Sequence, residues 1–93
     1  MITEKLQNAI NEQITAEMWS SNLYLAMSFY MDKEGYCGMA SWLKKQAHEE
    51  HEHACELASY IIKRGGKAKL DKIDVVPNDF GTPLEVFEQV YKH

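Results

Sequence analysis

Apolar and small residues recur at helical spacing over the first third of the chain. They are Leu6, Ile10, Ile14, Ser21, Tyr24, Ser28 and Met31, which follow one another at steps of three, four or seven. Thr3 is suited to cap the start of a helix and Gly35 to end it, so the pattern predicts a helix over about residues 4–33. Glu17 interrupts this stripe, because it lies seven residues after Ile10 and seven before Tyr24.

A second segment with a helical period runs from about residue 37 to residue 64. Its stripe consists of Met39, Leu43, Gln46, Glu50, His53, Leu57, Tyr60 and Arg64. These positions alternate steps of four and three, as in the seam of a coiled coil. The pair 65-GG-66 ends the helix, and the short link between the two long helices predicts an antiparallel hairpin. Glu50 and His53 are thus polar residues in a stripe that calls for apolar ones.

The rest of the chain predicts a long connection and the start of a third helix. Residues 65–82 lack a helical period, and 73-IDVV-76 is suited to a short extended strand. Such a connection is typical of a crossing between opposite ends of a helix bundle. The motif 82-TPLE-85 is a capping box that predicts a helix over 83–93. The expected fold class is all-α: one domain over 1–93 that forms half of a four-helix bundle, a crossover and a short third helix.

Composition and charge narrow the classes of function. The chain of 93 residues carries a formal charge of -4, which gives it no basic surface for nucleic acid or for an anionic membrane. The N-terminus lacks the apolar segment of a secretory signal, and the run 23-LYLAMSFYM-31 is far shorter than the ~20 residues of a membrane span. On one helix, Cys37 and Cys55 would lie ~27 Å apart, too far for a disulfide. These features predict a cytoplasmic protein with reduced thiols.

Glu17, Glu50 and His53, the polar residues within the two apolar stripes, are expected to lie at the same height along the hairpin when it folds about Gly35. Glu17 lies 18 residues before this glycine, while Glu50 and His53 lie 15 and 18 residues after it. Buried polar groups without a neighbouring Lys or Arg need a compensating cation, so the pattern predicts a metal site. Oxygen ligands with one imidazole suit iron or manganese better than structural zinc. A hydrated polar layer in the bundle is the alternative interpretation.

The spacing of the His, Glu and Cys residues over 48–55 does not match the motifs of other metal enzymes. A zinc protease motif needs His-Glu-x-x-His, whereas 48-HEEHE-52 ends in Glu and 51-HEHAC-55 ends in Cys. The beginning of a zinc deaminase motif at His48 is not followed by Pro-Cys-x-x-Cys. His48, His51 and Cys55, at i, i+3 and i+7, form a candidate surface site for a soft or borderline metal. An ordinary solvated helix face, with a small thiol beside the core, is the simpler interpretation of these three residues.

The order of several motifs resembles that of the bacterial non-haem ferritins. They are Glu17, Tyr24, 49-EEHEH-53, 60-YIIKRGG-66, 73-IDVVP-77 and 82-TPLEVFE-88. The resemblance covers the family's first two helices, the crossover and the start of the third helix. It implies that Glu17, Glu50 and His53 are ligands of a di-iron ferroxidase centre, in which Glu50 bridges the irons. It also implies that Tyr24 stands just outside these ligands and that Glu49 binds an additional iron.

The activity implied by this resemblance is the oxidation of Fe(II) by O₂ or peroxide, followed by storage of the Fe(III) mineral in a 24-subunit cage. In this family the remaining ligands come from the third and fourth helices, and the next carboxylate would fall just beyond His93. The family usually has Leu in place of His51, and rarely a His at position 48. A truncated or engineered ferritin fragment that binds metal and self-assembles without turnover is the alternative function, and a helical interaction module without metal is a third.

Apolar side chains on the outside of the hairpin predict self-association. Trp19, Leu23, Phe29 and Trp42 are expected to remain exposed if two helices bury only one seam. A two-fold pair of hairpins would rebuild a four-helix bundle around two copies of the predicted metal ligands. This arrangement resembles that of the encapsulated ferritins, whose iron site forms at a dimer interface.

Overall fold

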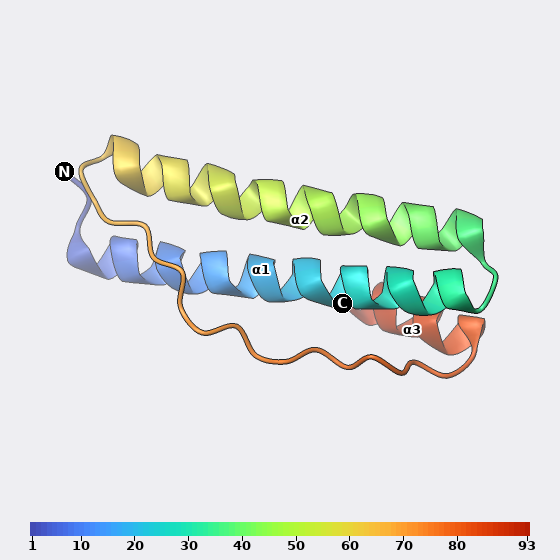
Figure 1. Cartoon of the computed structure of the whole chain (residues 1–93). Coiled ribbons are helices and arrows are strands. Elements are labelled where there is room, and N and C mark those ends of the chain that lie inside the picture. Colours follow the sequence, from blue (N-terminus) through green and yellow to red (C-terminus); the bar gives the residue numbers. More distant parts are fainter.

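Two long antiparallel helices form the body of the molecule. The computed structural model describes residues 1–93, with helices α1 (Glu4–Lys33), α2 (Cys37–Lys63) and α3 (Pro83–Lys92). Figure 1 shows α1 and α2 side by side, while the connection after α2 runs back along α1 to the hairpin turn, where α3 begins. There is no strand, so the all-α prediction is confirmed and the expected strand at 73–76 is wrong. None of the helices has the length and apolar character of a membrane-spanning segment.

The ends of the helices are fixed by threonine and glycine residues. Thr3 and Thr82 cap α1 and α3 with their side-chain oxygens, each of which accepts a backbone N–H three residues further on at 3.2 Å. Gly35 and Gly65 have φ angles of 89° and 79°, a left-handed conformation that favours glycine. After each of them the chain donates a backbone N–H to a carbonyl of the last helical turn, which ends α1 and α2.

On α2, alanines rather than most of the predicted stripe line the seam with α1. The buried residues of α2 are Ala40, Leu43, Ala47, Ala54 and Ile61. On the α1 side, the hydroxyls of Ser21 and Ser28 donate hydrogen bonds of 2.7 and 2.6 Å to backbone carbonyls of α2. Alanine lets the helices approach closely, so the seam on α2 is displaced from most of the predicted stripe. Glu50 and His53 consequently lie on one flank of the seam instead of on it. On α1, by contrast, Ile14, Ser21, Ser28 and Met31 of the predicted stripe are buried, which confirms that part of the pattern.

Two apolar clusters stabilise the two ends of the hairpin. The cluster near the turn comprises Leu23, Ala26, Met27, Met31, Ala40, Leu43, Phe80 and Val86, and the other comprises Ile14, Ala54 and Ile61. The expectation that Leu23 is exposed is wrong, because Phe80 of the crossover and Val86 of α3 belong to the same cluster and cover that side of α1. Phe29 and Trp42 are 63% and 47% exposed. The level of Glu17 and Glu50 lies between the two clusters.

One buried side chain anchors the start of the crossover to α1. The Nδ2 atom of Asn11 donates to the carbonyl of Lys67 at 3.0 Å, and its Oδ1 atom accepts the N–H of Lys69 at 2.8 Å. Gln7 adds one bond, since its Oε1 atom accepts the N–H of Lys67 at 3.1 Å. Asn11 is only 4% exposed, so water has little access to these bonds.

Replacing Asn11 by alanine is expected to lower the free energy of unfolding by about 1–3 kcal/mol, because backbone groups beneath the crossover lose their partner. Gln7→Ala is the matched control, since it removes a single and more accessible bond and is expected to cost less. Urea unfolding followed by circular dichroism measures both variants. Equal costs for the two would contradict the anchoring role of Asn11.

Candidate metal centre

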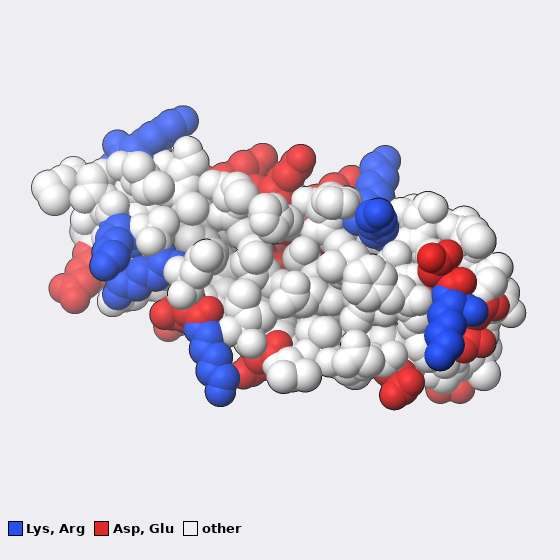
Figure 2. Space-filling view, in the orientation of Figure 1, with Lys and Arg blue, Asp and Glu red and all other residues white.

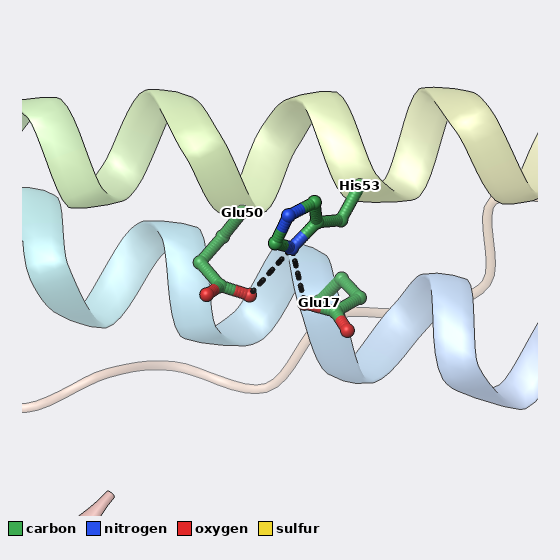
Figure 3. A group of neighbouring side chains, drawn as sticks. All are labelled: Glu17, Glu50 and His53. Atoms are coloured by element: carbon green, nitrogen blue, oxygen red, sulfur yellow. Dashed lines mark ion pairs between the residues drawn. The ribbon is translucent and has the colours of Figure 1, made fainter.

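Three side chains from two helices meet in the middle of the hairpin. Glu17 lies on α1, while Glu50 and His53 lie one turn apart on α2. Each offers one possible ligand atom, and these atoms all lie within 4.8 Å of one another. Figure 3 shows the three side chains pointing toward one another between α1 and α2. No other group of three or more His, Cys, Asp or Glu side chains converges in this way.

The imidazole stands beside both carboxylates. His53 Nδ1 lies 3.9 Å from Glu17 Oε2 and 3.8 Å from Glu50 Oε2, the two contacts drawn in Figure 3. The side chains of Glu17 and Glu50 are 19% and 23% exposed, whereas that of His53 is 54% exposed. The expectation that His53 is buried is therefore wrong, because its position on the flank of the seam leaves one side of the ring open to solvent.

A neighbouring amide orients the first carboxylate. Gln13 lies one turn before Glu17 on α1, and its Nε2 atom donates a hydrogen bond of 3.0 Å to Glu17 Oε1. The other oxygen, Oε2, is the one nearest to His53. One oxygen of Glu17 is thus held by the protein, and the other is directed toward the group.

A hydrogen bond between Glu17 and Glu50 shifts the pKa values of the two carboxyls in opposite directions. The hydrogen bond with Glu17, together with desolvation and the charge of Glu17, raises the pKa of Glu50 to about 7. The hydrogen bond from Glu50 is also the largest cause that lowers the pKa of Glu17; desolvation opposes it, and Gln13 and His53 reinforce it. Near neutral pH, Glu17 is therefore the more readily ionised carboxyl, and Glu50 is the one that holds the shared proton.

The group has the chemistry of a divalent-cation site. His53 is the only basic residue that forms an ion pair with Glu17 or Glu50, so no Lys or Arg neutralises them. Two adjacent carboxylates repel each other once both are ionised, and a cation between them removes this repulsion. Two carboxylates with one imidazole suit iron or manganese, and no thiolate is present to favour structural zinc. A metal ion between Glu17 and Glu50 would be stabilised by the same negative charge that holds the shared proton.

Binding of a divalent cation is expected to weaken as the pH falls below about 7, the pKa of Glu50. The carboxyl is protonated below that pH, and a cation binds the ionised form, so binding must displace the proton. If one proton is displaced, the apparent affinity falls by about tenfold per pH unit well below the pKa. Calorimetric titration with Co(II), an air-stable substitute for Fe(II), measures the affinity and the protons released. Equal affinity and no proton release across pH 6 to 8 would contradict the shared proton.

Glu49 and Tyr24 lie near the group without joining it. Glu49 is exposed and forms no ion pair with His53. Tyr24 is half-buried two turns after Glu17, and burial and the charge of Glu50 raise the pKa of its hydroxyl. Their implied roles in iron chemistry therefore stay predictions.

The candidate surface site of His48, His51 and Cys55 is only partly assembled. All three side chains are exposed. Cys55 Sγ lies 3.8 Å from His51 Nδ1, but His48 does not converge with them. Cys37 and Cys55 are both free thiols.

The sequence patterns did not predict the position of His93. Its Nε2 atom lies 2.7 Å from Ser20 Oγ, and its ring contacts the rings of Trp19 and Tyr24 with centroid distances of 5.8 and 5.5 Å. It also contributes to the lowered pKa of Glu17. Helix α3 has 10 residues. A helix of that length rises about 15 Å from the hairpin turn, which is the one signal that could have placed position 93 beside this part of α1.

The fold and the donor set define a class: helical proteins whose candidate metal ligands are carboxylates and histidine from facing helices. Within this class, the chain belongs to the ferritin family, because the model of the ferritin-like domain matches residues 7–93. It is 71% identical over 93 residues to a bacterial non-heme ferritin from Bacteroides fragilis (strain 638R). It is 39% identical over 88 residues to a bacterial non-heme ferritin from Staphylococcus epidermidis. The resemblance noted in the sequence is thereby confirmed.

Solved structures agree with this family assignment. An engineered closed form of the Archaeoglobus fulgidus ferritin matches with a TM-score of 0.95 and 39% identity, over 99% of this chain. A structure of the open-pore ferritin from the same archaeon matches with a TM-score of 0.93. The chain spans 58% of the length of the B. fragilis relative, 53% of the S. epidermidis relative and 56% of the engineered ferritin.

Proposed function

We propose that this chain binds Fe(II) through Glu17, Glu50 and His53, and that it takes part in ferritin-type oxidation and storage of iron. One observation carries the proposal: two carboxylates and an imidazole from two helices converge within 4.8 Å. Membership of the ferritin family supports iron as the metal. The shared proton and the lack of a Lys or Arg partner support these residues as ligands.

In the proposed reaction iron is the substrate. Each Fe(II) loses one electron to become Fe(III), and O₂ or peroxide takes up the electrons. Glu17 and His53 hold iron from the two helices, and Glu50 is the carboxylate that bridges to a second iron. Glu50 also releases its proton to solvent as iron binds. Gln13 is a positioning residue, because its hydrogen bond leaves the second oxygen of Glu17 free for iron.

Two further residues belong to the proposal in supporting roles. Tyr24 is half-buried close enough to Glu50 for that charge to raise the pKa of its hydroxyl, which suits a residue that stands just outside the iron ligands. Glu49 precedes the bridging carboxylate and is exposed, so it can bind an additional iron near the surface. These roles rest on the family resemblance more than on contacts within the chain.

The surface beside the site is suited to attract cations. Figure 2 shows acidic side chains along the middle of the α2 edge, with basic side chains on either side of them. In this part of α2 the exposed acidic residues are Glu49, Glu52 and Glu56. Negative charge around a site raises the local concentration of cations and the rate at which they bind. We infer that Fe(II) enters along this edge, past the exposed ring of His53.

Self-association is part of the proposal, since three protein donors leave several positions of an iron ion free. The chain exposes large apolar side chains, among them Phe29, Trp42, Phe87 and Tyr91. Packing two hairpins through such side chains would bury apolar surface and bring a second set of ligands to the centre. Analytical ultracentrifugation with and without Fe(II) tests this, and a monomer under both conditions would contradict it.

The function is tested by adding Fe(II) to the chain in aerated buffer and following the absorbance of Fe(III) in the near ultraviolet. Oxidation faster than in buffer alone is the expected result. Binding of Fe(II), measured without oxygen, but with no acceleration in air would leave the alternative of a metal-binding fragment without turnover. Absence of Fe(II) binding would contradict the proposal altogether.

A further inference from the structure

An apolar hollow lies on the flank of the α1–α2 seam opposite to the carboxylates. It has a volume of about 230 Å³ and is lined by residues of α1, α2 and the start of the crossover. Three of its lining residues carry soft metal donors: Met18 on α1, and His51 and Cys55 on α2. Most of the other lining side chains are apolar, and none is a carboxylate.

This hollow is separate from the candidate iron site. Successive residues of an α-helix are rotated by about 100°, so His51 and Cys55 face one flank of the seam while Glu50 and His53 face the other. Alanine and isoleucine of the seam fill the space between the two flanks. The two groups of donors can therefore act independently.

The distance between the two α2 donors suits a single small cation. Cys55 Sγ lies 3.8 Å from His51 Nδ1, and the two residues are four apart on a continuous helix. Metal bonds of about 2.3 Å to sulfur and 2.0 Å to nitrogen, at an angle of about 120°, place their donors about 3.7 Å apart. The spacing of this pair suits an ion with trigonal coordination. Met18 of α1 also lines the hollow, so its thioether is the candidate for the third ligand.

The donor types select the kind of cation. Thiolate and thioether sulfur prefer soft ions such as Cu(I), whereas iron prefers oxygen ligands, which the side chains of the hollow do not supply. Lys69 is the only Lys, Arg, Asp or Glu residue in the lining, so no carboxylate attracts hard cations. We propose that the hollow binds one Cu(I) ion through the Cys55 thiolate, the His51 imidazole and the Met18 thioether. The thiol proton of Cys55 passes to solvent as the bond to sulfur forms.

The proposed site differs from the surface site of His48, His51 and Cys55 that the sequence suggested, because Met18 takes the place of His48. His48 shares the spacing of the motif but does not line the hollow, whereas Met18 does and comes from the other helix. His48→Ala is therefore a matched control for His51→Ala, since both remove an exposed imidazole from α2. Met18→Leu removes the thioether and nearly conserves the volume of the side chain.

The test is an anaerobic titration with Cu(I) against a colorimetric Cu(I) chelator, in a Cys37→Ser background that removes the second exposed thiol. One Cu(I) per chain is expected, with X-ray absorption showing sulfur and nitrogen ligands. Cys55→Ser is expected to abolish this binding, His51→Ala to weaken it by more than about tenfold, and Met18→Leu to weaken it less. His48→Ala and Glu50→Gln should leave it unchanged.

Two outcomes would overturn the proposal. If His51→Ala and Met18→Leu both bind Cu(I) as tightly as the parent chain, the ion is held by an exposed thiol alone. If Cys55→Ser still binds, the ion lies elsewhere. Circular dichroism of each variant establishes that it is folded, which is expected because His51 and Cys55 are exposed. The result is independent of iron chemistry, because the Glu50→Gln control removes only the other site.

Discussion

Replacing Glu50 by glutamine is expected to lower the rate of Fe(II) oxidation by about 100-fold or more, to nearly the rate in buffer. Substitution of residues that only support metal ligands costs about 10–100-fold in affinity or activity, and loss of a direct, bridging ligand should cost at least as much. Glutamine has the shape of glutamate but neither its charge nor its capacity to bridge two cations. The measurement is the absorbance of Fe(III) after addition of Fe(II), at equal concentrations of chain.

Glu52→Gln is the matched control, because Glu52 is an exposed carboxylate on the same helix. It is expected to change the rate by no more than a few-fold, through the local charge alone. The Glu50 variant should also be at least as stable as the parent at pH 8, since it removes one of two adjacent carboxylates that are both ionised above about pH 7. Equal losses of activity in the two variants would show that overall charge matters and the ligand position does not.

Replacing Leu43 by alanine is expected to lower the free energy of unfolding by about 2–5 kcal/mol, the usual cost of removing a buried leucine side chain. Leu43 is completely buried in the cluster near the hairpin turn, which also contains Met27 and Met31 of α1 and Val86 of α3. A chain of this size has a total stability of about 5–15 kcal/mol, so the loss is a large fraction of the whole. Urea unfolding followed by circular dichroism measures it.

Leu84→Ala provides the matched control for that substitution. Leu84 lies on α3 and is 66% exposed, so its removal should change the free energy of unfolding by only about 0.5 kcal/mol. Both variants must be compared at the same chain concentration, because association would add to the apparent stability. Similar costs for Leu43 and Leu84 would mean that the described core does not stabilise the hairpin.

The all-α hairpin could be predicted because local signals agree with one another. A helical period without Gly or Pro covers residues 4–33, and glycines follow both long helices at the points where positive φ angles end them. Equal distances from Gly35 were enough to place Glu17 level with Glu50 and His53, and the structure brings their ligand atoms within 4.8 Å. That these residues bind iron stays a prediction.

The face that α2 buries could be predicted only in part, because alanine gives almost no signal in a hydrophobic pattern. Ala40, Ala47 and Ala54 form much of the seam on α2, and the larger residues that seemed to form it lie to one side. This displacement explains why His53 is half exposed. It also explains why His51 and Cys55 lie beside a hollow on the other flank.

The contacts that the crossover and α3 make with α1 could not be predicted from the sequence either. Leu23 is buried by Phe80 and Val86, which are more than fifty residues away in the chain, and His93 reaches Ser20 over a similar separation. Such contacts depend on the path of the crossover. The start of that path is anchored by the two hydrogen bonds of Asn11, a residue with no distinctive pattern in the sequence.

The central claim is that Glu17, Glu50 and His53 together bind iron. Its most direct test is anomalous diffraction at the iron absorption edge, from crystals of the chain prepared with Fe(II) in the absence of oxygen. We expect an anomalous peak within about 2.5 Å of oxygen atoms of Glu17 and Glu50 and of a ring nitrogen of His53. A peak only at other side chains, or no peak at these three residues in crystals that contain iron, would contradict the claim.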